Sequence, residues 1–159
     1  MTIQIDSREK NRAIKNIVKT FEKYNIVHFK SKLPCGDYCN LDNARFCIDR
    51  KQSLFEVCNN VCQDNTRFIE ELKRAQKLGI KLVFLVEHSA GIKSLEDVQE
   101  WKNPRLKTSP LAVSGERLYK ILSVLEKTYN TKFYFCSKAE TGEFIIKLLS
   151  SKKRGAGNE

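Results

Sequence analysis

The run LVFLV at residues 82–86 decides the fold class, because it has no polar position to turn toward water. A strand with one wet face alternates apolar and polar residues, whereas a strand covered on both faces is a continuous apolar run. The residues before it, 65–78, predict a helix with Phe68, Leu72 and Ala75 on its inner side, which ends at a glycine. We therefore expect a central strand at 82–86 with helices packed on each side of the sheet.

The chain beyond this strand returns to regular structure after one irregular segment. Residues 88–115 follow neither the helical nor the strand period. An apolar stripe then predicts a helix over 116–129, followed by a strand over 132–136 and a last helix that ends at Leu149.

The chain before residue 65 predicts strands and helices in alternation. A strand over 2–6 precedes a helix over 10–24, and Asp6 and Ser7 stand where a capping residue would. In the next strand Val27 and Phe29 alternate with polar residues. A hairpin over 37–51, with turn residues at 42–43, and a helix over 53–62 complete this half.

The order of elements predicts one α/β domain over residues 1–150, a mixed central β-sheet flanked by helices, with a disordered polar tail over 151–159. No apolar run approaches the ~20 residues that span a bilayer, and no hydrophobic signal opens the chain. We expect an intracellular protein without a membrane or a small-molecule cofactor, in the cytoplasm of a bacterial or phage-infected cell, with the nucleus left open.

The net charge of +10 is concentrated at the two ends of the chain. Residues 1–50 carry +4, residues 51–100 carry −1 and residues 101–159 carry +7. A basic surface of this kind favours a polyanion as partner, and a surface that only keeps the protein soluble is the alternative.

The six cysteines include two close pairs, Cys35 with Cys39 and Cys58 with Cys62. Their spacing is compatible with a structural zinc site, which would make the protein a zinc-stabilised binding module. The alternative, which we prefer, is that they are small buried thiols in regular elements.

The segment FCIDRK at 46–51 carries the residues best suited to chemistry. Side chains alternate along a strand, so Phe46 and Ile48 point into the core while Asp49 and Lys51 share the opposite, solvent-facing side. Asp37 lies on the adjoining hairpin strand, within reach of Asp49. Two facing carboxylates repel each other unless a hard cation such as Mg²⁺ or Mn²⁺ lies between them.

Three strings in order, IDSRE at 5–9, CGDY at 35–38 and CIDRK at 47–51, resemble the nuclease domain of the XPF and Hef proteins. Those proteins are structure-specific DNA endonucleases of the PD-(D/E)XK superfamily. The resemblance implies a restriction-endonuclease-like core that cuts branched, flapped or junction DNA in repair, recombination or replication. Because no helix-hairpin-helix module follows Leu149, we expect a stand-alone domain like those of phages.

The resemblance also assigns the active site. It carries the metal ligands to Asp37 and Asp49, with Asp49 in place of the family glutamate, and the catalytic lysine to Lys51. The cofactor it implies is Mg²⁺ or Mn²⁺. Arg50 matches the family arginine but alternation turns it away from Lys51, and the acid that follows is Glu56.

The resembled first-strand motif adds Asp6, Arg8 and Glu9. Asp6 is either a catalytic acid or the helix cap described above. A catalytically inactive DNA-binding or dimerisation module of the same fold is the alternative function, and the intact acids and lysine argue against it.

The partners follow from charge and from the family. We expect branched DNA to contact a set of basic residues: Arg8, Arg67, Lys73, Lys102, Arg105 and Lys107. Trp101 either stacks on an unpaired base or fills the edge of the core. The family pairs its nuclease domains, so we expect a homodimer through two apolar stripes, unless the monomer core uses both: Leu118, Ile121, Leu122, Leu125, Phe144, Ile145, Leu148 and Leu149.

Overall fold

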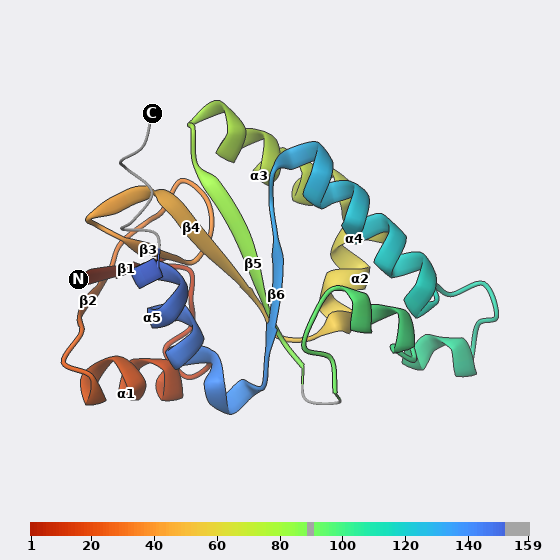
Figure 1. The fold of residues 1–159 in the computed structure, drawn as a ribbon, viewed down its shortest axis with the longest axis horizontal. Coiled ribbons are helices and arrows are strands. Elements are labelled where there is room, and N and C mark those ends of the chain that lie inside the picture. The colour runs from red at the N-terminus through yellow and green to blue at the C-terminus, as the bar shows by residue number, and fades with distance from the viewer. Residues whose placement is uncertain (89–90, 152–159) are drawn as a thin grey trace.

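The structure is a computed structural model that describes residues 1–88 and 91–151. It contains a six-stranded sheet in the order β2-β1-β3-β4-β5-β6 (Figure 1). The strands are β1 (Thr2–Ile5), β2 (Val27–Lys30), β3 (Tyr38–Asn40), β4 (Asn43–Lys51), β5 (Lys81–Glu87) and β6 (Phe133–Cys136). β3 runs antiparallel to β1 and β4, and the other neighbours are parallel. The predicted mixed sheet is confirmed.

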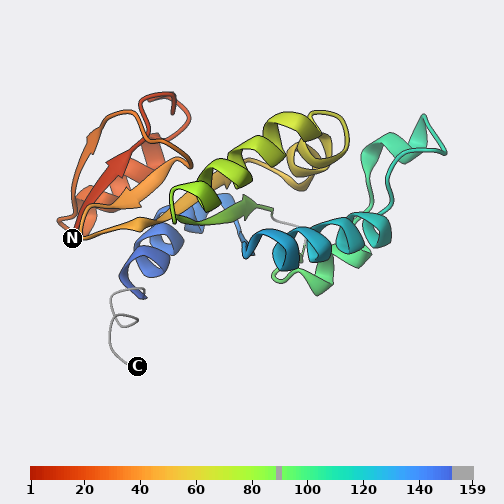
Figure 2. The same cartoon turned by 90° about the horizontal axis from the view of Figure 1, so that it is seen from above.

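Helices cover both faces of this sheet (Figures 1 and 2). They are α1 (Lys15–Lys23), α2 (Leu54–Cys62), α3 (Asn65–Lys77), α4 (Gly115–Tyr129) and α5 (Thr141–Ser151). On one face Leu82, Phe84 and Val86 pack with α2, α3 and α4. On the other face Val83 and Leu85 pack with α1 and α5. The run at 82–86 is therefore apolar throughout because each face of β5 meets its own layer of helices.

The first helix begins five residues later than predicted, at Lys15. Residues 7–14 form turns, and the cap position is taken by Ile14 without a side-chain hydrogen bond. Asp6 does not cap the helix, because both of its carboxylate oxygens accept hydrogen bonds elsewhere, from Arg8 and Leu33. The alternation in β2 also misleads. β2 is an edge strand, and Val27 and Phe29 are exposed.

The segment predicted to be irregular contains two short 3-10 helices, η1 (Glu96–Glu100) and η2 (Pro104–Lys107). Two of its residues, 89 and 90, lie outside the described structure. Trp101 is 9% exposed and belongs to the core on the α4 side of the sheet. It is thus a core residue and does not offer a free face for a base.

Both apolar stripes are used inside the monomer. The α4 residues pack in one core cluster and the α5 residues in the other; among them only Ile121 and Phe144 are partly buried. The expectation that these stripes leave apolar surface for a partner is therefore wrong. A homodimer remains a prediction that must rest on another surface.

The last helix runs two residues past Leu149, to Ser151, so the first residue assigned to the polar tail is helical. The rest of the predicted tail, 152–159, lies outside the described residues. Within residues 1–88 and 91–151 no helix combines the length and the apolar character needed to cross a bilayer.

Candidate active site

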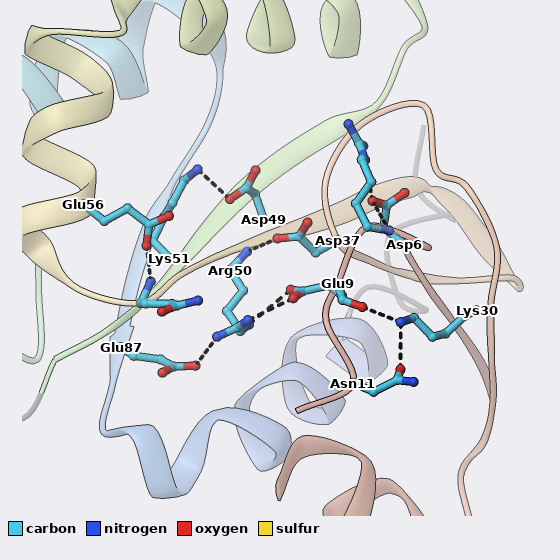
Figure 3. A network of polar contacts seen from close by, with 12 residues as sticks. Asp6, Glu9, Asn11, Lys30, Asp37, Asp49, Arg50, Lys51, Glu56 and Glu87 are labelled. Atoms are coloured by element: carbon cyan, nitrogen blue, oxygen red, sulfur yellow. Dashed lines mark hydrogen bonds and ion pairs between the residues drawn. The ribbon is translucent and has the colours of Figure 1, made fainter. Parts of the chain in front are cut away.

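The β3–β4 hairpin places two carboxylates side by side. Asp37 comes directly before β3, where its backbone N–H donates to Ile48 O at 2.7 Å. The N–H of Arg50 on β4 in turn donates to Asp37 Oδ2 at 2.8 Å, which turns this carboxylate toward the end of β4 that carries Asp49 (Figure 3). Backbone hydrogen bonds of the hairpin therefore fix the orientation of Asp37.

The turn before Asp37 requires a glycine. Gly36 has a φ of +72°, and a Cβ there would lie 3.1 Å from the Cβ of Cys47, from Ile48 O and from Leu82 Cδ1. Its N–H donates to Glu71 Oε1 of α3 at 2.9 Å. The turn before Asp37 is thus fixed by hydrogen bonds both to β4 of the hairpin and to α3.

Asp49 is 5% exposed, and burial is the main reason that its carboxyl is easily protonated. Burial raises the pKa of Asp49 to about 7; Lys51 opposes the rise, and Glu71 adds to it. Burial, followed by repulsion from Asp49 and Glu9, also holds the pKa of Asp37 well above its ordinary value. The pair is electrostatically unfavourable when both groups are charged.

Lys51 is the cation nearest to this pair. Its Nζ lies 3.1 Å from Asp49 Oδ1 and its side chain is 13% exposed. Burial alone would lower the pKa of Lys51, but Asp49 and the carboxylates of Glu56 and Glu71 outweigh it and raise the pKa. The Nζ also lies 5.9 Å from the ring centres of Phe68 and Phe84, so Lys51 projects over the aromatic floor between α3 and β5.

The expectation that Asp49 and Lys51 lie on a solvent-facing side of the strand is wrong. Their side of β4 continues the buried position of Cys47, and α2 and α3 cover it. The side chains of Asp49 and Lys51 are 7% and 13% exposed. The carboxyl group of Asp49 and the ammonium group of Lys51 are thus partly desolvated, which strengthens their electrostatic interactions.

Arg50 lies on the opposite face, as alternation predicts. Its Nη2 lies 2.9 Å from Glu9 Oε2 and its Nη1 lies 3.1 Å from Glu87 Oε1. All three side chains are at most 9% exposed. This buried ion triplet joins the segment after β1 to the ends of β4 and β5 (Figure 3). Arg50 and Glu9 therefore stabilise the end of β4 from the face opposite Asp49 and Lys51.

Asp6 and Arg8 form a separate pair. Asp6 is fully buried; its Oδ1 accepts from Leu33 N at 2.8 Å and its Oδ2 lies 2.6 Å from Arg8 Nε. Burial would raise the pKa of Asp6, but these hydrogen bonds outweigh it and lower the pKa. Asp6 orders the loop that leads to Asp37, and Arg8 remains largely exposed.

Two further carboxylates belong to the site. Glu56 accepts a hydrogen bond from Gln52 N just after β4, and Glu71 holds Gly36. Both act electrostatically on Asp49 and Lys51. Glu71 and Glu87 were not identified from the sequence. Helical spacing turns Glu71 about 100° around α3 from Glu70, but only the tertiary fold shows what that side meets.

The donor set is compatible with a divalent cation. No group of three or more His, Cys, Asp or Glu side chains in the described part of the chain is arranged as a ready metal site. Asp37 and Asp49 nevertheless offer oxygens, and apart from the 3.1 Å ion pair with Lys51 Nζ the buried Asp49 Oδ1 accepts no hydrogen bond from the described residues. A hard cation would relieve the mutual repulsion of the pair and satisfy this oxygen.

A hollow of about 160 Å³, which we call the Lys51 hollow, opens beside the lysine. Its lining residues come from β4, α2, α3 and the turn between the two helices: Lys51, Asn60, Asp64, Arg67, Phe68 and Glu71. Arg67 is exposed, and its Nη1 lies 3.8 Å from Asp64 Oδ2. Lys73 is exposed but lies about 200° around α3 from Glu71. Arg74, three residues after Glu71, lies on the same side of α3 as Glu71, and its Nη1 donates to Pro34 O.

The cysteine pairs lie apart. Cys35 and Cys39 are buried beside Cys47 next to the hairpin, whereas Cys58 and Cys62 follow each other on α2. All six are free. The thiols pack with the apolar residues of one core cluster, except Cys62, which is exposed, and Cys136, which packs in the other.

Comparison with known proteins gives two kinds of match. The family profile described as the ERCC4 domain matches residues 5–148. Among solved structures, XPF from Aeropyrum pernix matches with a TM-score of 0.69 at 17% identity, and XPF from Aeropyrum pernix in complex with DNA matches with 0.65 at 19%. Each match covers 98% of this chain but only 66% and 68% of the other chain. No curated protein matches the sequence.

Proposed function

The chain belongs to the ERCC4 domain family, and from this premise we propose that it is an Mg²⁺- or Mn²⁺-dependent endonuclease that cuts branched, flapped or junction DNA. The observation that carries the proposal is the facing pair Asp37 and Asp49, each with a raised pKa, beside the ammonium group of Lys51. Two carboxylates that can hold a metal ion and one ammonium group that can stabilise negative charge are suited to phosphodiester hydrolysis.

Each residue has a separate task in this mechanism. Asp37 and Asp49 would hold the cation, which when bound polarises the phosphoryl oxygen and makes water more acidic. Lys51 donates from Nζ to the scissile phosphate or orients the attacking water. Glu71 holds the turn before Asp37, and the Glu9–Arg50–Glu87 triplet keeps β4 in register with its neighbours.

DNA binding is the second part of the proposal. The chain carries a net charge of +10, and the exposed Arg67 stands at the Lys51 hollow. A fold shared with an XPF that is known in complex with DNA supports a nucleic-acid substrate. The enzyme would then act on intracellular DNA in repair, recombination or replication.

A homodimer is the third part. β6 lies at one edge of the sheet, and a hollow of about 560 Å³ beside it is lined in part by Leu95 and Tyr134. This edge, rather than the apolar stripes of α4 and α5, is the surface on which a second copy would pair. Light scattering that shows a monomer at high micromolar concentration would contradict this part.

The test of the activity is cleavage of labelled branched and linear DNA of equal length with Mg²⁺, Mn²⁺ or EDTA. Wild-type protein should cut the branched DNA only with metal. Asp49→Asn and Lys51→Ala should lower the rate by about three orders of magnitude or more. Glu70→Gln, which removes an exposed carboxylate on α3, is the matched control. Metal-independent cleavage, or full activity of either active-site variant, would refute the proposal.

A further inference from the structure

The basic loop, residues 102–113, projects from the body of the domain beyond α4 (Figure 2). It contains three basic side chains and no acidic one: Lys102, Arg105 and Lys107. All three are exposed, and none forms an ion pair with a described residue. Their charges are therefore available to an anionic partner.

The loop is rigid at its base and at its tip. The buried Asn103 closes the base: its Oδ1 accepts from Arg105 N and its Nδ2 donates to Val113 O at 2.9 Å. At the tip a turn over residues 109–112 is closed by Ala112 N and Ser109 O, with Pro110 and Leu111 at its centre. Proline at the second position of a turn is already set to the required φ, so this turn costs little entropy to hold.

This rigid turn presents a leucine to solvent. Leu111 is 90% exposed, and Leu106 on the same loop is 38% exposed. A single exposed leucine on a protein surface is ordinary. Here two leucines share a preorganised loop with three unpaired cations. This combination matches DNA, which has anionic phosphates on its outside and apolar base faces in its interior.

The loop also lies close to the active site. A second hollow of about 180 Å³, the Leu111 hollow, is lined by Leu111 and Arg105 together with Asn59 and Gln63 of the α2 end. The next residues in sequence, Asn60 and Asp64, line the Lys51 hollow. The two hollows therefore flank the same turn between α2 and α3. A DNA strand that leaves the Leu111 hollow can enter the Lys51 hollow.

We propose that the basic loop is the branch-reading element of this nuclease: Leu111, supported by Leu106, inserts against an unstacked base step while Lys102, Arg105 and Lys107 hold the flanking phosphates. The proposal rests on the proposed function, because it defines the substrate of the same site. It replaces Trp101, which is buried, as the group that meets a base.

Selectivity follows from the cost of unstacking. Apolar wedges that enter DNA must separate neighbouring bases, and this costs a few kcal/mol in a continuous duplex. The cost is least where bases are already unpaired, as at a branch point. Phosphate contacts, in contrast, are made equally by branched and linear DNA. Leu111 should therefore govern preference and the three cations should govern overall affinity.

The test measures binding in EDTA, so that it does not depend on cleavage. A splayed-arm DNA with 2-aminopurine beside the branch is compared with a linear duplex of equal length. Leu111→Ala should weaken binding to the branched DNA roughly tenfold and abolish the fluorescence rise, while linear binding is unchanged. The matched control is Leu78→Ala. Leu78 is an exposed leucine at the C-terminal end of α3, about 20 Å from the first turn of that helix.

Every other result overturns the proposal. Leu111→Ala that binds both DNAs like wild type removes the leucine from recognition, and an equal loss on both makes it a general contact. A wild-type protein without preference for the branch has no branch reader. If Leu111→Ala alters only self-association in light scattering, the loop is a protein interface. A failure of the proposed catalysis is seen separately, as intact binding without metal-dependent cleavage.

Discussion

Replacing Asp49 with asparagine should stabilise the metal-free protein at pH 8 while it abolishes catalysis. Asp49 is 5% exposed and has a pKa of about 7, against the ordinary aspartate value of 3.8. Folding therefore favours the protonated carboxyl. The stability that the carboxyl contributes is present in full below pH 3.8 and is lost as the pH rises through 7. Asparagine resembles the protonated group and avoids this loss.

The pKa shift sets the magnitude. A rise from 3.8 to about 7 corresponds to at most about 4 kcal/mol of stability lost at pH 8. The same values give about 2 kcal/mol at pH 5, where the folded carboxyl is protonated and the unfolded one is mostly ionised. The attraction of Lys51 is already contained in the shift. Lys51 keeps Glu56 and Glu71 as neighbours in the variant, so it is not left as an isolated buried charge.

Urea denaturation in EDTA at pH 5 and pH 8 measures both values. The stabilisation by Asp49→Asn should be larger at pH 8. Addition of Mg²⁺ or Mn²⁺ should stabilise the wild type at pH 8 and leave the variant unchanged, because a ligand stabilises only the state that binds it. Glu70→Gln should change neither curve. A variant that is less stable than wild type at pH 8, or equally affected at both pH values, would show that ionisation of Asp49 does not destabilise the folded protein.

Three further predictions concern the turn before Asp37 and the basic loop. Gly36→Ala should lower the free energy of unfolding by about 1–3 kcal/mol in urea, because of its positive φ and the 3.1 Å contacts of a Cβ; an unchanged midpoint would contradict this. Glu71→Ala should lower kcat more than Glu71→Gln at similar KM, since glutamine can still accept a hydrogen bond from Gly36 N. Equal kcat values would show that this hydrogen bond does not contribute to catalysis. Alanine at all three cations of the basic loop should flatten a salt slope of about −3 to −4 by about 2 to 3 on branched and linear DNA alike, and an unchanged slope would place the DNA path along Arg67.

The hydrophobic periodicity of the sequence is sufficient to predict an element where buried residues recur at regular spacing along the chain. The apolar run at 82–86, the helix stripe of α3 and the alternation in β4 each report how one element meets its neighbours. For this reason the hairpin that carries Asp37 and Asp49 was predicted with the correct pairing of faces. The same alternation placed Arg50 on the face opposite Lys51.

Contacts between distant segments were beyond the reach of periodicity. The pairing of Arg50 with Glu87 and the support of Gly36 by Glu71 span 37 and 35 residues. The start of α4 lies close to the backbone of Trp101, where a Cβ added at Gly115 would meet Trp101 O at 2.5 Å. No local pattern distinguishes that tryptophan from an exposed one.

The late start of α1 has a local cause that competes with helix propensity. A carboxylate at residue 6 is a good cap in isolation. In the folded domain Asp6 is instead fully occupied by Leu33 N and by Arg8, so the chain makes turns until Ile14. The choice between cap and loop anchor depended on a contact 27 residues away.

The ion triplet of Glu9, Arg50 and Glu87 has a consequence for the order of folding. The hairpin that carries both carboxylates closes locally, and hairpins form within about 1–10 μs. The triplet joins residues 41 and 37 positions apart, so it can form only after β5 has paired with β4. A nascent chain that ends before β5 would carry Asp37, Asp49 and Lys51 without Glu87, one of the two counter-charges that pair with Arg50 in the interior. The competent site is therefore completed late in folding, with the closure of the sheet.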